Sequence, residues 1–391
     1  MKILFSADWH LGYELGGANP APRLDDQLRQ IRKIAGYIEE HDVDVLAIAG
    51  DVFEAQERGK ARQAIGGMMD ALAAPLSRGL RLIAVAGNHD RDWFIETANL
   101  WLGADAAGEG RITLRTRPDL VTVRKGDDAV NFVLAPFPTA ARYDLRQTDA
   151  AGAGQRNELL AKRYIEELEL LRRRSAEQRL PAVLLTHVTV EGTEVGPYKI
   201  SPRDDVVIPR GGFPEFELTV IGHIHKPERI GSAHFYYVGA LDRMDVSERD
   251  YGARVLLADV GPQGVRSVES LPLDPTPFER VVAATEDELY AAHARMERPL
   301  ETLVKLTLQV PYGAYTQPLV EVARRIFPRL YGNVEHDWQD VPVVAPAIEG
   351  LNTADVEGTV RRYLEEQQMP EAERDALLAL VRELREAKAE R

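Results

Sequence analysis

Short apolar runs alternate with stretches of helical periodicity over about the first 270 residues. The runs cover residues 2–6, 43–49, 80–86, 130–134, 182–186 and 218–221. Between the first two runs, apolar residues from Leu24 to Ile38 recur at spacings of four and three, which predicts a helix with one apolar face. The same spacing from Leu160 to Leu171 predicts a second helix, after a glycine-rich loop at 148–156. Strands that alternate with helices predict a layered α/β domain.

The pattern changes after residue 270, where three prolines within residues 271–277 indicate a domain boundary. A small α+β unit follows, with strands predicted at 278–283, 302–310 and 333–338 and helices at 286–296 and 318–327. Two short amphipathic helices end the chain, with apolar faces at Val360, Tyr363 and Leu364 and at Leu377, Leu380, Val381 and Leu384. We therefore predict three parts, at 1–270, 275–340 and 346–391. The apolar faces of the tail need burial on this chain or on a partner, and we favour a partner.

Composition narrows the chemistry that these parts can perform. The chain has 391 residues and no cysteine, which excludes disulfides, thiolate nucleophiles and cysteine-ligated zinc. Any metal would need His, Asp, Glu or Asn as ligands. With 48 Lys and Arg against 62 Asp and Glu, the formal charge of −14 argues against a protein that coats nucleic acid through its net charge. Neither a signal peptide nor a membrane-spanning apolar run is recognisable, so we predict a cytoplasmic protein.

Residue types that bind metals follow five of the predicted strands. They are Asp8 and His10, Asp51, Asn88 with His89 and Asp90, His187, and His223 with His225. Because the carboxyl ends of strands in an α/β sheet meet at one edge, these side chains can converge from distant parts of the chain. Each motif alone is of a kind that is common in turns. All five in this order, each directly after an apolar run, are not expected by coincidence and indicate a functional site. The remaining histidines lack this context and are interpreted as surface or structural: His41, His234, His293 and His336.

The number of donors predicts two metal ions. Seven oxygen and nitrogen donors exceed the coordination of one tetrahedral ion and suit two ions that share a bridging carboxylate. Asp51 is the best bridge, because a carboxylate has two oxygens and the preceding glycine allows a tight turn. The spacing of Asp8 with His10, and of His223 with His225, puts both members of each pair on one side of an extended segment. Oxygen and imidazole ligands without a soft donor favour manganese.

His89 has a different predicted role, because it adjoins the predicted ligand Asn88. An imidazole beside two metals can protonate a leaving oxygen or stabilise charge on a phosphoryl group. Asp90 could hold that ring by a hydrogen bond. The predicted reaction is in-line attack on phosphorus by hydroxide generated at the metals.

These motifs resemble those of the calcineurin-like metallophosphoesterases, whose pattern is D-x-H, G-D, G-N-H-D/E, a single His and G-H-x-H. Within that superfamily the chain is similar to the SbcD subunits of bacterial SbcCD nucleases, on residues 6–12 (SADWHLG), Arg23 with Asp26, and 237–243 (YVGALDR). The resemblance covers about residues 1–270 and implies an α/β/β/α sandwich with two facing sheets. It assigns one metal to Asp8, His10, Asp51 and His225, the other to Asp51, Asn88, His187 and His223, and catalysis to His89.

The resemblance also implies a DNA-binding capping domain at 275–340 and a helical tail that binds the coiled coil of an SbcC-type ATPase. Because the chain is acidic, we add the hypothesis that DNA binding depends on this partner and on a homodimer of the nuclease subunit. In the predicted cap, Arg325 and Arg329 could face a phosphate backbone, against the alternative of a solvated charged surface. One position departs from the subfamily. Glu54 stands where a histidine often follows the G-D motif, which leaves the balance of exonuclease and endonuclease action open.

The function predicted from the sequence is a manganese-dependent DNA exonuclease and endonuclease that processes ends and hairpins within an ATPase complex. Two alternatives remain. One is a phosphodiesterase or phosphatase that acts on something other than DNA. The other is a scaffold that binds DNA ends and carries a vestigial metal site, although an intact ligand set argues against decay.

Overall fold

The computed structural model describes residues 1–54, 58–103, 110–145, 152–195, 198–199, 205–231, 234–339, 355–366, 374–375 and 377–381. The chain forms two compact units. The first comprises Met1–Val310 and Tyr315–Asp337, and the second comprises Pro311–Ala314 and Trp338–Arg391. Each unit is described by itself.

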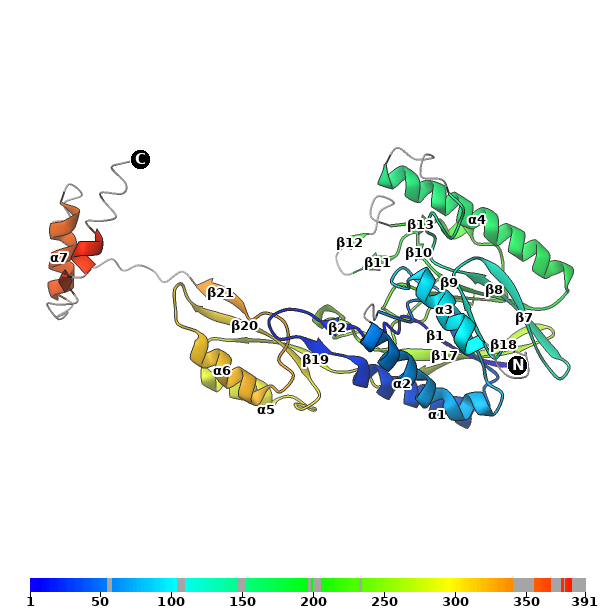
Figure 1. Cartoon of the computed structure of the whole chain (residues 1–391), viewed down its shortest axis with the longest axis horizontal. Coiled ribbons are helices and arrows are strands. Elements are labelled where there is room, and N and C mark those ends of the chain that lie inside the picture. Colours follow the sequence, from blue (N-terminus) through cyan, green and yellow to red (C-terminus); the bar gives the residue numbers. More distant parts are fainter. Residues whose placement is uncertain are drawn as a thin grey trace. The chain divides into compact units, whose positions relative to one another are not determined.

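Two six-stranded mixed sheets form the centre of the first unit (Figure 1). The first has the order β18 (Gly264–Pro272), β17 (Arg254–Gly261), β1 (Lys2–Ser6), β4 (Val45–Ile48), β5 (Arg81–Val85), β6 (Ile112–Arg115). The second has the order β15 (Glu228–Arg229), β16 (Phe235–Tyr237), β14 (Leu218–Gly222), β9 (Ala182–His187), β8 (Asp128–Ala135), β7 (Asp119–Lys125). In the first sheet β1, β4, β5 and β6 are parallel, and in the second β8, β9, β14 and β16 are parallel.

The sheets face each other and helices cover their outer faces. Ile3 and Phe5 of β1 share the inner core with Phe132 of β8 and Val183 of β9. Their neighbours in sequence, such as Leu4, point outward to α1 (Leu24–Glu40), α2 (Arg58–Ser77) and α3 (Asp92–Gly103). The outer face of the second sheet is covered by α4 (Ala153–Glu177) (Figure 1). Strands buried on both faces read as continuous apolar runs, which is why they stood out in the sequence. The predicted α/β/β/α sandwich is confirmed.

Some elements differ from the prediction. Helix α4 begins at Ala153, inside the loop predicted to extend to 156, because Gly152 adopts the extended conformation of an N-cap residue. Helix α2 was not predicted, since Gly66, Gly67 and Pro75 break its apolar pattern. Gly67 is needed for the packing of α2 against α1, because a Cβ at this position would lie 2.5 Å from Cδ1 of Leu28. The edge strands β6, β7 and β18 and the inner strand β17 were also absent from the prediction.

A small subdomain follows the third proline of the 271–277 segment, Pro277. Parallel strands β19 (Phe278–Ala283) and β20 (Leu303–Pro311) pair in a three-stranded sheet with β21 (Glu335–Gln339), and helices α5 (Glu286–Ala294) and α6 (Gln317–Ile326) accompany them. Each element matches its predicted position within a few residues. The core of the subdomain continues into the first sheet's loops, where Phe278, Leu303 and Tyr331 pack with Leu15 and Val246. The predicted boundary at 275 stays a prediction.

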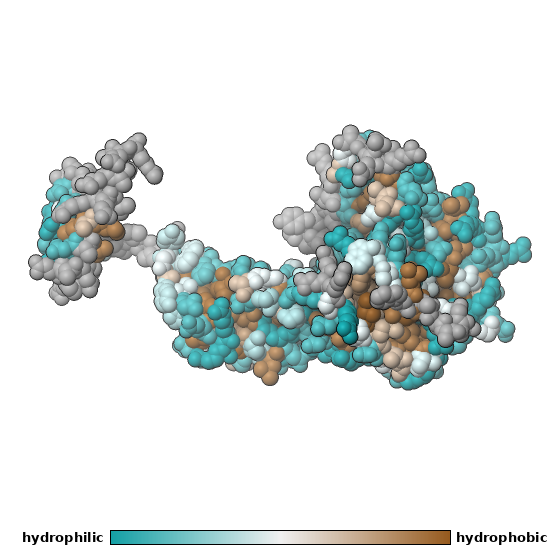
Figure 2. Space-filling model, in the orientation of Figure 1, coloured by the Kyte–Doolittle hydropathy of each residue, from teal (hydrophilic) through white to brown (hydrophobic). Residues whose placement is uncertain are grey.

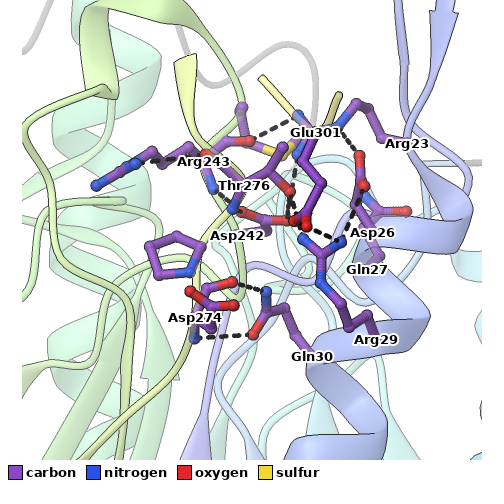
Figure 3. Close-up of polar contacts among 12 residues, drawn as sticks. Arg23, Asp26, Gln27, Arg29, Gln30, Asp242, Arg243, Asp274, Thr276 and Glu301 are labelled. Carbon is purple, nitrogen blue, oxygen red and sulfur yellow. Dashed lines mark hydrogen bonds and ion pairs between the residues drawn. The ribbon is translucent and has the colours of Figure 1, made fainter. Parts of the chain in front are cut away.

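A buried polar network joins this subdomain to helix α1 (Figure 3). The fully buried Arg23 donates hydrogen bonds to Asp26 (2.8 Å), Asp242 (3.2 Å) and the carbonyl of Arg243 (2.7 Å). Asp242 accepts two further bonds from the backbone and hydroxyl of Thr276, both of 2.6 Å. The network therefore ties α1, the segment after β16 and the start of the subdomain into one joint.

Two neighbours extend this joint in opposite directions. Arg329 reaches Asp26 with two hydrogen bonds of 2.6 and 3.1 Å. Burial alone would raise the pKa of Asp26, but the bonds from Arg329 and the pairing with Arg23 outweigh it and lower that pKa below its ordinary value. On the other side, Gln27 donates to the carbonyls of Trp9 (3.1 Å) and His10 (2.7 Å).

In the second unit the structure describes α7 (Val356–Glu366) and a short helical segment that includes 377–381. Leu364 is buried within this chain, whereas Tyr363 of the same predicted face is 41% exposed. Burial of the tail on a partner stays a prediction. In the following segment the buried residue is Leu378, while Leu377 and Leu380 are exposed. Leu384 lies outside the described residues. No helix in the described part of the chain combines the length and apolar character that crossing a bilayer requires.

The surface of the body is mostly polar. Figure 2 shows hydrophilic residues over most of the visible face, with smaller hydrophobic areas between them. A surface of this kind suits a domain whose core is closed by its own helices.

Candidate metal centre

The predicted ligands lie on loops that leave the carboxyl ends of five parallel strands. β1, β4 and β5 of the first sheet and β9 and β14 of the second end at the same edge of the sandwich. Backbone hydrogen bonds fasten the first two loops together, from Asp8 to the carbonyl of Gly50 (3.0 Å) and from His10 to that of Asp51 (2.9 Å). The structure therefore brings all seven predicted ligands into one region.

Several of these residues have a backbone conformation that is unfavourable for side chains other than glycine. Asp8, His10, Asp51 and His223 have φ values of 49°, 43°, 50° and 87°. A non-glycine residue held there costs on the order of 1–3 kcal/mol, and such strain is concentrated at functional sites. Four strained residues at one edge indicate that side-chain placement, and not backbone stability, determines this arrangement.

Two glycines leave room for the ligands. A Cβ on Gly50 would lie 2.2 Å from Nδ1 of His187, and a Cβ on Gly87 would lie 2.0 Å from Oδ1 of Asp51. Gly50 also has a φ of 91°. The glycines of the G-D and G-N-H-D motifs are therefore required by close packing of the ligands against the backbone.

Each of the four predicted histidine ligands has one ring nitrogen held by an oxygen. His10 Nδ1 lies 3.1 Å from Glu54, His187 Nδ1 lies 2.7 Å from the carbonyl of Ala49, His223 Nε2 lies 2.7 Å from Asp205, and His225 Nδ1 lies 2.7 Å from Glu248. Metal-binding histidines characteristically donate their second N–H in this way, because it fixes the ring and its tautomer. In all four residues the other ring nitrogen remains as a potential metal ligand, and those of His187 and His223 contact Asn88.

The second ring nitrogens of His10, His187 and His223 contact the carboxylate of Asp51 and the amide oxygen of Asn88. Nε2 of His10 and Nε2 of His187 lie 3.6 and 3.2 Å from the same oxygen of Asp51, Oδ2. Oδ1 of Asn88 lies 3.0 Å from Nε2 of His187 and 2.9 Å from Nδ1 of His223. Asp51 thus lies between the two predicted ligand sets, which is the position that a bridging carboxylate needs.

The chemistry of the cluster fits divalent cations. Nε2 of His10 is buried and has no hydrogen-bond partner among the described residues. Asp8 and Asp51 are almost completely buried, and within the described chain no Lys or Arg forms an ion pair with either. Buried carboxylates without a cationic side chain need another positive charge, which metal ions supply. Potential ligand atoms of Asp8, His10 and His225, and likewise those of Asp8, Asp51 and His187, lie within 4.8 Å of one another.

His89 lies beside this cluster and is held by Glu54. Its side chain is 44% exposed, and its Nδ1 lies 2.8 Å from Oε2 of Glu54. Burial would raise the pKa of Glu54, but the bonds from His10 and His89 lower it to about 2. The bond to Glu54 in turn raises the pKa of His89. Glu54 therefore carries a full negative charge and holds both imidazoles.

Asp90 does not hold the His89 ring, contrary to the prediction. Its buried carboxylate accepts hydrogen bonds from the backbone N–H groups of Val52 (3.1 Å), Phe53 (2.9 Å) and Gly87 (2.9 Å). Three amide donors satisfy the carboxylate and turn it away from the imidazole. Asp90 therefore joins the loops after β4 and β5. We predicted a catalytic role for it, and the structure gives it the role of positioning these loops.

Arg142 supports the same loop from the other side and was not predicted. Its buried guanidinium donates to the carbonyls of Gly87 and Asp90, each at 2.8 Å, and pairs with Asp92 at 2.6 Å. No motif surrounds Arg142, so the sequence offers no signal for it. Asp205 and Glu248 were missed for the same reason, whereas Glu54 was noticed only as a departure from the family pattern.

The predicted DNA-binding arginines do not share a helix face. α6 ends at Ile326, and Arg329 lies beyond it with its guanidinium bound to Asp26. Arg325 is 66% exposed and contacts Tyr290 at 3.1 Å. Contact of either arginine with DNA stays a prediction, and for Arg329 it would compete with the ion pair to Asp26.

Comparison with known proteins places the fold. A family model described as calcineurin-like phosphoesterase matches residues 1–227, which is more than half of the chain. Among solved structures, a protein assigned as a 5′-nucleotidase from Staphylococcus aureus is 14% identical with a TM-score of 0.40, and the match covers 77% of this chain and 59% of that one. A dimetal phosphatase from Danio rerio is 12% identical with a TM-score of 0.38, covering 70% and 99% of the two chains.

A purple acid phosphatase from yellow lupin seeds is 13% identical with a TM-score of 0.33, covering 70% and 53%. The chain thus spans less than two thirds of the length of the nucleotidase and of the lupin phosphatase. At such TM-scores these similarities carry no conclusion about substrate. The match over residues 1–227, in contrast, covers every predicted metal ligand, and the chain belongs to the calcineurin-like phosphoesterase family.

Proposed function

We propose that this protein is a metal-dependent nuclease that hydrolyses phosphodiester bonds in DNA, as the SbcD-type subunit of an SbcCD-like complex. The observation that carries the hydrolase part is the arrangement of the four histidines. In each, one ring nitrogen is held by an oxygen, and the other is left for the cluster formed by Asp8, Asp51 and Asn88. That arrangement is typical of histidines that bind metals and supports a metal centre at this position.

The ligand set supports two divalent cations. Asp8, His10, Asp51 and His225 would hold one, and Asp51, Asn88, His187 and His223 the other. When bound, these cations would neutralise phosphate oxygens and provide hydroxide at neutral pH. Manganese is the metal that we propose, because the donors are oxygens and imidazoles with no thiolate or thioether among them.

Residues of the chain would then complete the reaction. His89 would hold a proton at Nε2, since its Nδ1 is bound to Glu54, and would donate it to the leaving oxygen. Glu54 keeps the imidazole oriented and favours its protonated form. Asp90 and Arg142 hold the loop that carries Asn88 and His89. The predicted ligand Asn88 and the predicted acid His89 therefore keep fixed positions relative to each other.

DNA as substrate and an ATPase as partner rest on the subfamily resemblance. The motif at 6–12, the β19–β21 subdomain and the terminal helices all match what the resemblance implies. A phosphatase or a phosphodiesterase for another substrate would use the same metal chemistry and has no need of these additions. A scaffold with a vestigial site would have no reason to keep Glu54, Asp205 and Glu248 on the histidines.

Purified full-length protein incubated with end-labelled duplex and hairpin DNA, with Mn²⁺ or with EDTA, tests this proposal. We expect cleavage with Mn²⁺ and none with EDTA. Hydrolysis of p-nitrophenyl phosphate or bis(p-nitrophenyl) phosphate without cleavage of DNA would favour the alternative phosphoesterases. DNA binding without hydrolysis of any of these substrates would favour the scaffold.

The partner is tested by co-purification from cells that co-express a coiled-coil ATPase of the SbcC type. We expect the full chain to retain the ATPase and a variant that ends at residue 345 to lose it while keeping hydrolysis of bis(p-nitrophenyl) phosphate. Retention by both would show that the tail is not the binding site.

A further inference from the structure

A hollow of about 240 Å³ adjoins the metal centre on the side of β14. Its lining includes the predicted ligands His223 and His225 and, beside them, Lys226, Ser247 and Tyr251. These last three residues come from the loop after β14 and from the segment around the short 3₁₀ helix Val246–Glu248. The hollow therefore shares two predicted ligands with the metal centre.

Three polar groups of this hollow are unengaged. Within the described chain, the ammonium group of Lys226 forms no ion pair or hydrogen bond, and the same is true of the hydroxyl groups of Ser247 and Tyr251. Lys226 is exposed, so its charge is available to a ligand. An ammonium and two hydroxyls can together donate several hydrogen bonds to one acceptor-rich group.

Glu248 is the one acidic residue among the described residues of the lining, and it is already engaged. Oε1 of Glu248 lies 2.7 Å from Nδ1 of His225, and Oε2 accepts a 2.7 Å hydrogen bond from the backbone of Met244. Because both carboxylate oxygens have partners, Glu248 opposes an incoming anion less than a free carboxylate would. The hollow therefore offers donors and a positive charge to its occupant.

The donors continue into a neighbouring hollow of about 540 Å³, which shares Lys226 and Tyr251 and adds Arg254 and Asp250. Nε of Arg254 is buried without a hydrogen-bond partner, and its Nη2 donates to the carbonyl of Tyr237. Asp250 is the acidic member, and it pairs with Arg249 at 3.6 Å. A strand that left the metals past Lys226 would meet a second cation along this path.

We propose that Lys226, Ser247 and Tyr251 form a subsite for a second phosphate, one nucleotide away from the phosphate that reacts at the metals. The inference rests on the proposed function and deepens it, because it specifies ligands that carry two phosphates separated by a nucleoside. An ammonium group binds phosphate as a point charge, and hydroxyls add directed hydrogen bonds. A monoester with a single phosphate would leave the subsite unused.

The test compares two small nucleotides by calorimetric titration into the full-length protein in Mn²⁺. Thymidine 3′,5′-bisphosphate offers both phosphates, and thymidine 5′-monophosphate offers one. We expect the wild type to bind the bisphosphate about tenfold more tightly, the size of one charge-assisted contact. The Lys226→Met variant should reduce this preference to less than about twofold, whereas Lys226→Arg should keep most of it.

Two further variants sharpen the result. Tyr251→Phe removes a hydroxyl but no charge and should lower the preference about two- to threefold. Lys162→Met, on the exposed face of α4, removes the same charge at a distance and should leave the preference intact. Added salt should weaken the preference of the wild type more than that of Lys226→Met, because the contact is ionic.

The proposal is overturned if the wild type binds the two nucleotides equally, or if Lys226→Met keeps the full preference. Neither result depends on whether DNA is cut. Cleavage of DNA without a preference for the bisphosphate would remove the subsite and leave the nuclease proposal standing. If the wild type cuts no DNA but shows a preference that Lys226→Met abolishes, the subsite stands and the nuclease proposal falls.

Discussion

Replacing Glu54 with Gln tests how the chain positions its metal ligand and its acid together. Nδ1 of His10 and Nδ1 of His89 lie 3.1 and 2.8 Å from the same atom, Oε2 of Glu54. The amide oxygen of Gln can occupy that position, so the substitution keeps the acceptor and removes the charge. Hydrogen bonds to a charged group are roughly twice as strong as neutral ones, and each contributes about 1.5–3 kcal/mol.

If each of the two bonds loses half of its energy, the total loss is about 1.5–3 kcal/mol. This loss is divided between the metal affinity at His10 and the orientation of His89. We therefore expect Glu54→Gln to weaken Mn²⁺ binding about tenfold, and Glu54→Ala, which removes the acceptor as well, to weaken it up to about a hundredfold. The assay is the Mn²⁺ dependence of bis(p-nitrophenyl) phosphate hydrolysis, with calorimetric titration of the metal as a second measurement.

The same variant changes the pH profile. Because Glu54 raises the pKa of His89, its replacement by Gln should lower that pKa, and the protonated acid should be lost at a lower pH. The alkaline limb of kcat should therefore move toward lower pH, while the acid limb shows no titration of Glu54, whose pKa is about 2. Glu39→Gln, at an exposed site on α1, serves as the control. Unchanged metal affinity together with an unchanged alkaline limb in Glu54→Gln would refute this account.

Three further outcomes follow from the structure. His89→Ala should lower kcat on bis(p-nitrophenyl) phosphate about a hundredfold or more while Mn²⁺ affinity measured by calorimetry stays within about threefold, and an undiminished kcat would exclude it as the acid. Arg142→Met leaves buried carbonyls and Asp92 without their donor, so urea unfolding should show a loss of about 3–5 kcal/mol, against no more than about 0.5 for the exposed Arg163→Met. Arg329→Met should cost about 2–4 kcal/mol at pH 7. Since the folded-state pKa of Asp26 is lowered, its pairing stabilises the fold fully above about pH 4 and is lost below that, so the gap between wild type and variant should narrow at pH 3.

The metal ligands were predictable because they lie within a few residues of strand ends, and the strands themselves are recognisable as apolar runs. Asp8 and Asp51 follow the largely buried strands β1 and β4 within three residues, and His187 is the last residue of β9. The parallel order of the strands within each sheet brings these ends together. The oxygens that hold the histidines were not predictable, because Asp205 and Glu248 reach the site from loops whose path depends on the complete fold. No local pattern distinguishes them from solvated acidic residues.

Asp90 and Glu54 show a different limit. Adjacency in sequence suggested that Asp90 holds His89, but three backbone amides take up its carboxylate, and Glu54 crosses from the neighbouring loop instead. The fold class was predictable from alternating runs buried on both faces. Helix α2 was not, because its packing against α1 relies on a glycine that breaks the apolar periodicity.

Helix α1 supports two parts of the molecule on consecutive residues. Asp26 receives Arg329 from the subdomain, and Gln27 holds the carbonyl of His10 in the first metal loop. The buried ion pairs of this joint cannot be separated without leaving charges unpaired in the interior. A displacement of the subdomain would therefore be passed through a single turn of α1 to the loop that carries His10. The placement of the subdomain and the placement of the predicted ligand His10 therefore depend on the same turn of α1.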